Sequence, residues 1–116
     1  MEITRSIILR IFKIAKNRVG IVDSVRLRLV PMKRKIASVS LKTNTIRLNK
    51  ILISLLGSDV IEYLIIHELI HIKLGTLSHG LDFLREIKKF YSERDIERLE
   101  NKIVEIVNAY EVMLHS

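Results

Sequence analysis

The chain contains no cysteine and no tryptophan, and its 116 residues include only one proline and four glycines. Without cysteine the protein can form neither a disulfide nor a thiolate metal site, so His, Asp or Glu must hold any metal. This composition fits a reducing compartment, and we expect a cytoplasmic protein. Aromatic residues make up 5% of the chain, which gives little support for recognition of single-stranded nucleic acid by base stacking.

Long apolar segments are also missing from the sequence. The longest apolar stretch, residues 60–74, contains three charged side chains and is too short to span a bilayer. The first ten residues mix three further charged side chains with apolar ones, which is not the pattern of a secretory signal. We therefore expect a soluble protein without a membrane partner.

Acidic residues are nearly absent from the first half of the chain. Residues 1–57 contain 13 lysines and arginines against two acids, a net charge of +11, whereas residues 58–116 contain seven against 11, a net charge of −4. A basic half of this kind attracts polyanions such as nucleic acid or acidic polypeptides. An ordinary solvated surface would have the same composition, so nucleic acid is a candidate partner and both interpretations stay open.

The hydrophobic spacing predicts one helix, three strands and three further helices. These elements are expected in turn over residues 2–18, 25–30, 36–41, 45–48, 60–74, 80–91 and 92–113. Pro31 ends the first strand, and Gly75 is a natural stop for the second helix. Ser92 with Asp95 forms a capping box at the start of the last helix. The expected fold is α+β, with one domain covering residues 1–116.

His67, Glu68 and His71 carry the clearest chemical signal in the sequence. Residues four apart lie on one face of a helix, with Cβ atoms about 5–6 Å apart. The two imidazoles can therefore bind one Zn²⁺, each nitrogen at about 2.0–2.1 Å from the metal. Glu68 lies one position round the helix, from where it can take a proton from a metal-activated water as general base. The helix is apolar nearly all round, which indicates burial, and buried imidazoles and carboxylates need partners that a metal supplies.

A catalytic zinc needs a third protein ligand and one open coordination position. His79 is the best-placed candidate, because it follows four residues after Gly75, which ends the helix and lets the chain turn back. Glu86 is the alternative, because it lies two turns further along the next helix, on roughly the same face as His79. His115 lies at the C-terminal end and has no such context.

The segment from His67 to His71, with the sequence HELIH, is followed by HGLDF from His79 to Phe83. Together they resemble the HELxH and HGxxF signature of the SprT-like and YgjP-like metallopeptidases. The stretch 38–49 is similar to the paired strands of these families, and the likeness covers residues 36–91. The small size of the chain also resembles the archaeal minigluzincins, in which the third ligand is a glutamate.

The resemblance implies a zinc peptidase on a minimal zincin scaffold, with protein or peptide as substrate. It implies that a peptide lies extended along an edge strand within residues 36–48, above the active-site helix. It also implies that zinc polarises the scissile carbonyl while Glu68 deprotonates the water and later protonates the leaving amine.

Two alternatives stay open at this point. A zinc-stabilised module that binds nucleic acid or protein, without cleaving it, would use the same metal site and the basic first half. The last helix, 92–113, either completes the core with its apolar residues or covers the cleft, as a self-inhibiting segment does in minigluzincin zymogens.

Overall fold

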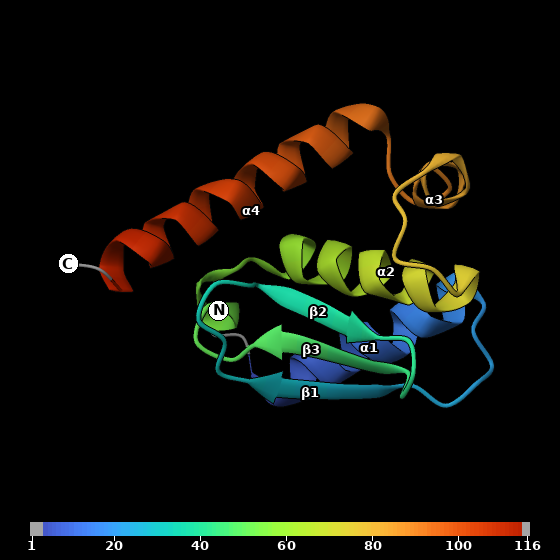
Figure 1. Cartoon of the computed structure of the whole chain (residues 1–116), viewed down its shortest axis with the longest axis horizontal. Helices are drawn as coiled ribbons and strands as arrows, with labels where there is room; N and C mark the ends of the chain where they lie inside the picture. The colour runs from blue at the N-terminus through green and yellow to red at the C-terminus, as the bar shows by residue number, and fades with distance from the viewer. Residues whose placement is uncertain (1–3, 115–116) are drawn as a thin grey trace.

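The computed structural model describes residues 4–114 and has the expected α+β fold. The elements are α1 (Arg5–Val19), β1 (Arg26–Val30), β2 (Ala37–Ser40), β3 (Thr45–Asn49), a 3₁₀ helix η1 (Ile53–Leu55), α2 (Ser58–Leu74), α3 (Leu81–Ile87) and α4 (Glu93–Leu114). In Figure 1, α1 passes behind the sheet, α2 runs along the edge formed by β2, and α4 crosses above α2. The predicted order of helices and strands is confirmed.

Two details differ from the sequence-based expectation. Helix α3 ends at Ile87 and not near residue 91, because Lys89 and Phe90 donate to carbonyls three residues back and tighten the chain into a turn. The short helix η1 between β3 and α2 was not predicted, since three residues are too few to show a helical period. Residues 2 and 3 of the predicted first helix lie outside the described residues.

Three helix ends follow capping signals in the sequence. The start of α2 does not: Ser58 and Asp59 were expected to cap it, but both lie within the helix, and Gly57 precedes it without a side-chain cap. Thr4 caps α1 through its hydroxyl, which accepts a hydrogen bond from the Ile7 N–H at 3.4 Å. Helix α2 ends at Gly75, which has φ of 67° and donates its N–H to the carbonyl of His71. The Ser92 hydroxyl accepts from the Asp95 N–H at 3.1 Å, as the predicted cap of α4 requires.

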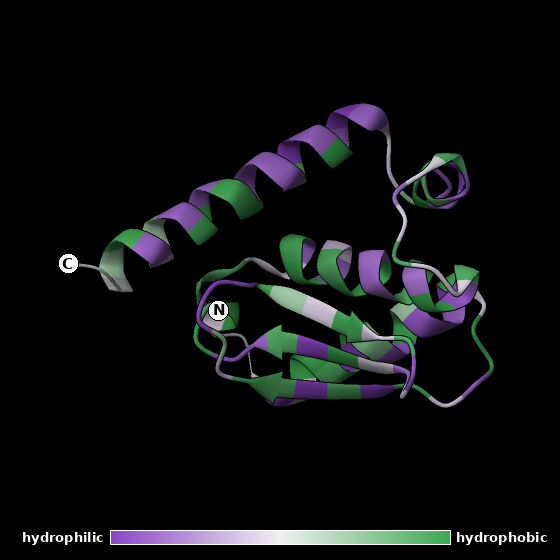
Figure 2. Cartoon of the chain, in the orientation of Figure 1, coloured by the Kyte–Doolittle hydropathy of each residue, from purple (hydrophilic) through white to green (hydrophobic). Residues whose placement is uncertain are grey.

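The sheet has the strand order β1-β3-β2. Strand β1 pairs with β3 in parallel, and β2 pairs with β3 as an antiparallel hairpin, so β2 forms an edge of the sheet. The core forms where one face of the sheet meets α1 and α2. Its fully buried members include Ile46, Leu48, Ile61, Leu69 and Ile70, and Figure 2 shows how apolar residues dominate α2.

Helix α4 also contributes to this core. Leu99 and Tyr110 are buried, and four further apolar residues of the helix pack against the core cluster, namely Ile96, Ile103, Ile106 and Val107. The apolar side of α4 faces α2 in Figure 2. Of the two alternatives for this helix, completion of the core is therefore part of its role. Within residues 4–114, no helix combines the length and apolarity that crossing a membrane requires.

Asn49 holds the connection between β1 and β2 in place. Its side chain is 0% exposed. The Nδ2 group donates to the carbonyls of Met32 and Lys35 at 3.0 and 2.9 Å, and Oδ1 accepts from the Ile51 N–H at 3.0 Å. The hydroxyl of Tyr110 donates to the same Met32 carbonyl at 2.9 Å, which ties α4 to this connection. The basic loop between the two strands is therefore anchored from both sides.

Replacing Asn49 with alanine is expected to lower the free energy of unfolding by about 2–4 kcal/mol. The substitution removes the three hydrogen bonds of the Asn49 side chain, and each hydrogen bond contributes about 0.5–1.5 kcal/mol. Urea denaturation at a fixed zinc concentration measures the change. The control Asn17→Ala, at an exposed position of α1, should stay within about 0.5 kcal/mol of wild type; equal effects of the two substitutions would contradict the anchoring role.

Candidate metal centre

The structure brings His67, His71 and His79 together at the end of α2. Their ligand atoms lie within 4.8 Å of one another, and they form the group of three potential metal ligands found among the described residues. Nε2 of His79 lies 3.1 Å from Nε2 of both His67 and His71. Two nitrogens bound to a tetrahedral zinc at about 2.0–2.1 Å lie about 3.3–3.4 Å apart, so these separations suit one zinc ion.

The hydrogen bonding of His71 prepares its Nε2 for a metal. Nδ1 lies 2.9 Å from the backbone carbonyl of Thr76. A carbonyl only accepts, so Nδ1 donates, and the neutral ring has its lone pair on Nε2, which faces His79. Fixing the ring of a metal-binding histidine in this way is the usual role of such an outer contact. The loop after α2 therefore provides both the third histidine and the partner that orients the second.

The site also favours neutral imidazoles. Burial, followed by the neighbouring rings of His71 and His79, lowers the pKa of His67 to about 3. Burial is also the main cause that lowers the pKa of His71, and His79 adds to it. A neutral imidazole is the form that binds a metal. The donor set and its protonation therefore fit zinc, the metal expected for nitrogen ligands in tetrahedral arrangement.

Glu68 is a buried carboxyl group beside the histidine cluster. The residue is 9% exposed. Burial raises the pKa of Glu68 to about 7, although the positive charge of Lys35 acts in the opposite direction. No hydrogen bond joins its carboxyl group to another residue within 4–114. A general base works best with a pKa near the working pH. The carboxyl oxygens of Glu68 are not fully enclosed, because no fully buried side-chain oxygen of the described residues lacks a hydrogen-bond partner.

Glu86, the alternative third ligand, lies away from the three histidines. Its carboxylate accepts from Lys73 at 2.8 Å and from Lys89 at 2.6 Å. These two hydrogen bonds lower the pKa of Glu86 and occupy both of its oxygens. The fold therefore brings His79 to the pair on α2 and directs Glu86 to the lysines. His115 lies outside the described residues.

The aromatic ring of Phe83 in α3 packs against all three imidazoles of the cluster. Its ring centroid lies 4.8 Å from those of His67 and His71 and 4.9 Å from that of His79. The side chain is buried, so it restricts the orientations of all three imidazoles. The sequence alone gave Phe83 no separate role. The signal that could have indicated a role in the site is its position four residues after His79, in the HGLDF segment.

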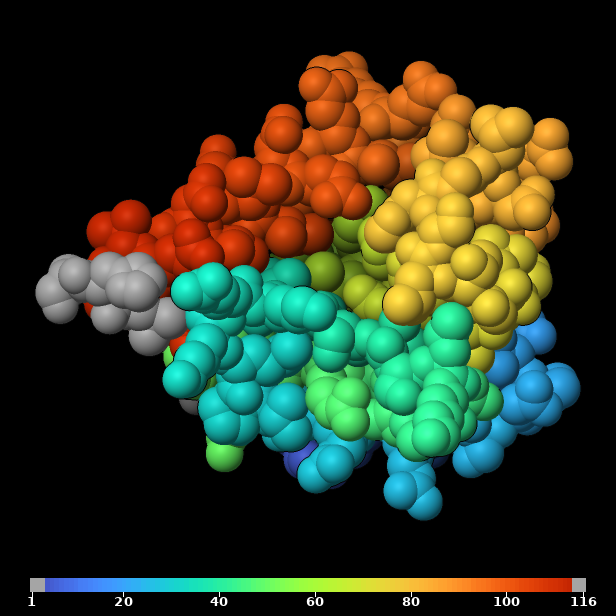
Figure 3. Space-filling view, viewed as in Figure 1, coloured from blue at the N-terminus to red at the C-terminus, as the bar shows by residue number. Residues whose placement is uncertain are grey.

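A cleft lies next to the histidines. Figure 3 shows the surface hollowed between β2, the segment that carries His79, and α4, with atoms of α2 at the bottom. A cavity of about 480 Å³ is lined by His67, His79, Tyr63, Phe83, Leu84, Ile87, Ile96 and Glu100. The last two belong to α4, and the hydroxyl of Tyr63 donates to Glu100 at 2.5 Å. Helix α4 therefore forms one wall beside the candidate metal centre.

The chain resembles known proteins over most of its length. A family model described as YgjP-like, metallopeptidase domain, matches residues 2–102. The structure of the metallopeptidase zymogen of Methanocaldococcus jannaschii jannalysin superposes with a TM-score of 0.81 and 36% identity, covering 84% of this chain and 88% of that one. For the metallopeptidase zymogen of Pyrococcus abyssi abylysin the TM-score is 0.77 and the identity 32%, covering 83% and 90%. An uncharacterized protein of M. jannaschii is 39% identical over 83 residues, which is 72% of this chain and 76% of that protein.

Proposed function

We propose that this chain, which belongs to the YgjP-like metallopeptidase family, hydrolyses peptide bonds with His67, His71 and His79 as zinc ligands. Glu68 acts as the general base. The enzyme is latent until α4 is displaced. Membership of the family and the two related structures make the chain a zinc peptidase that acts on a protein or peptide. They favour a peptidase over a binding module without cleavage activity. The cluster of three imidazoles is the observation that carries the assignment of the ligands.

Zinc bound by these histidines would supply Lewis-acid chemistry, which lowers the pKa of water and polarises a carbonyl group. The carboxylate of Glu68 accepts the proton that water loses as its oxygen attacks the carbonyl carbon. Glu68 then donates this proton to the departing amide nitrogen, so the carboxylate is restored at the end of the cycle. The burial of Glu68 keeps its pKa close to 7, which suits both directions of transfer.

The edge strand β2 is the surface along which a peptide would bind. Strand β3 covers one side of β2, and the other side borders the cleft above α2 (Figure 3). An extended peptide can add to such an edge through main-chain hydrogen bonds, which impose little sequence selectivity. Phe83 and the carbonyl of Thr76 hold the imidazoles in position while the peptide binds.

The test combines metal analysis of the wild-type chain with hydrolysis of an unfolded protein by a chain whose cavity is widened by Ile96→Ala and Glu100→Ala, alone and combined with Glu68→Gln or His79→Ala. About one zinc per chain, together with cleavage that depends on Glu68, is the expected result. A wild-type chain that binds no zinc would overturn the proposal.

Latency is supported by the place of α4 and by the relatives. Ile96 and Glu100 line the same cavity as His67 and His79, and both solved relatives are described as zymogens. The first half of α4 is held to α2 by ion pairs of Arg98 and Lys102 with Asp59. A substrate side chain in this cavity would contact Ile96 and Glu100 of α4.

Widening the cavity is expected to raise kcat/KM severalfold. In the double variant Ile96→Ala, Glu100→Ala the two α4 side chains that line the cavity are shortened, and the hydrogen bond from Tyr63 is lost. Initial rates on an unfolded protein measure the effect, with Val104→Ala, at a 55% exposed position of α4, as control. Unchanged rates in the double variant would leave α4 with a role in the core alone.

A further inference from the structure

A long segment of this chain contains positive charges without any negative ones. Residues 24–57 include eight lysines and arginines and no Asp or Glu. Every ion pair among the described residues uses an acid from residues 59–95. None of the eight cations forms an ion pair within the described part of the chain. The peptidase mechanism above uses none of these eight charges directly, apart from the effect of Lys35 on Glu68.

The sheet arranges three of these charges on one face. Arg28 of β1 and Arg47 of β3 are register partners, so their side chains leave the same face side by side. Ser38 of β2 is the register partner of Arg47 and completes a row across the three strands. Arg26 lies two residues from Arg28 on β1, about 6.6–6.8 Å along the same face. The alternate residues, such as Leu27 and Ile46, point into the core instead.

This arrangement costs stability in the free protein. Like charges directly opposite each other on neighbouring strands repel, whereas an acid at one of the two positions would stabilise the pair. Here no acid within residues 4–114 pairs with Arg28 or Arg47. A partner that brings negative charge to this face would remove the repulsion, and the loss of bound counterions would add to the binding free energy.

The same face is open and has basic groups at its border. No helix crosses the side of the sheet that faces the viewer in Figure 1, and its side chains form the surface in Figure 3. Lys33, Arg34 and Lys35 lie in the loop that leads into β2 and are exposed. Asn49 fixes the backbone of this loop from inside, so its charges are presented in a defined place.

We propose that this open face of the sheet, with the row of Arg28 and Arg47 at its centre, binds the phosphate backbone of double-stranded nucleic acid. The charges are spread as a repeated array and not gathered in one pocket, which suits a polymer with evenly spaced charges better than a single anionic group. No aromatic residue occurs between residues 24 and 57, so the face has no platform on which single-stranded bases could stack. It also lacks the apolar anchor at its centre that a stable protein interface uses.

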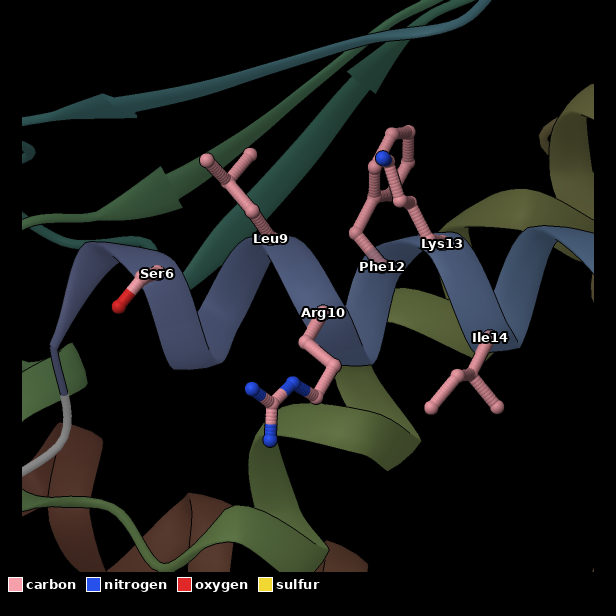
Figure 4. A pocket seen from close by; sticks show the side chains of 6 residues that line it. All are labelled: Ser6, Leu9, Arg10, Phe12, Lys13 and Ile14. Carbon is pink, nitrogen blue, oxygen red and sulfur yellow. The ribbon is translucent and has the colours of Figure 1, made fainter.

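A second basic surface of the chain provides the internal control. A hollow along α1 is lined by Ser6, Leu9, Arg10, Phe12, Lys13 and Ile14 (Figure 4). It lies on the opposite side of the sheet in Figure 1. Because it mixes two cations with apolar side chains, it is the surface that would contact an anionic membrane if the chain bound one.

The experiment measures binding of the full chain to a fluorescently labelled DNA duplex by anisotropy, at several salt concentrations. The sheet variant Arg28→Thr, Arg47→Thr keeps residues that favour strands. The control variant Arg10→Gln, Lys13→Gln removes the same charge from α1 with residues that favour helices. We expect wild-type Kd values of about 10⁻⁴–10⁻⁶ M at physiological salt, and a salt slope that falls by about 1.8 in the sheet variant, because each phosphate contact contributes about 0.9. The control should keep most of the wild-type slope.

Several results would overturn the proposal. Equal loss of affinity in the two variants would mean that net charge alone is responsible, and an unchanged slope in the sheet variant would exclude this face. Stronger binding to polyglutamate than to DNA would identify an acidic polypeptide as the partner. Binding to vesicles of anionic lipid, lost in the α1 variant and accompanied by no DNA binding, would identify a membrane. The zinc content of the sheet variant, measured alongside, shows that the fold and the metal site are intact.

Discussion

Replacing Glu68 with glutamine is expected to lower kcat/KM for peptide hydrolysis by about 100- to 10,000-fold, while the chain keeps its zinc. General acid and base catalysis contributes an acceleration of this size, and glutamine can neither accept the proton of water nor donate one to the leaving nitrogen. Zinc should stay bound because the imidazoles of His67, His71 and His79 form the cluster without help from the Glu68 carboxyl group.

The measurement compares initial rates on an unfolded protein with the zinc content of the same preparations. If the full chain is latent, both the reference and the Glu68→Gln variant are made in the Ile96→Ala, Glu100→Ala background. Glu62→Gln is the matched control, since Glu62 lies on α2 as well but contacts Arg18 and Tyr91 and not the cluster. Full activity in Glu68→Gln would remove Glu68 from the mechanism, and loss of zinc in that variant would make Glu68 a structural support of the site.

Replacing His79 with alanine is expected to weaken zinc binding by at least about 100-fold. Loss of an outer partner of a metal ligand already costs about 10–100-fold in affinity, and His79 supplies a nitrogen that lies 3.1 Å from both of the others. The remaining pair on α2 would hold the ion with two protein ligands in place of the usual three.

Competition with a chromophoric chelator measures this affinity, and the thermal shift on adding zinc gives a second reading, because a ligand that binds the folded state stabilises it. The control is Glu86→Ala, which removes the ion pairs to Lys73 and Lys89 and leaves all three histidines in place. Zinc binding that survives in His79→Ala but fails in Glu86→Ala would reverse the assignment of the third ligand.

Much of the fold could be predicted because its signals are local. Apolar spacing placed α1, α2 and α4, and the turn between β2 and β3 placed the hairpin, since a period of 3.6 or 2 residues is written directly into the chain. The end of α3 was misplaced, because the residues after Ile87 continue a helical pattern while i→i+3 hydrogen bonds turn the chain. The parallel pairing of β1 with β3 has no local signature and was not part of the prediction.

The sequence by itself determined that this protein has an α+β fold, a pair of histidines that share one face of a helix, and a glutamate beside them. It could do so because the i, i+4 spacing on a helix fixes which side chains share a face. Only the tertiary structure decided which of His79 and Glu86 lies beside the pair on α2, since the turn after Gly75 and the packing of α3 determine which side chain reaches that helix. The wall that α4 places beside the site and the row of Arg28 and Arg47 likewise depend on contacts between segments far apart in the chain. Sequence spacing cannot specify such contacts, because their geometry is set by the packing of the whole core.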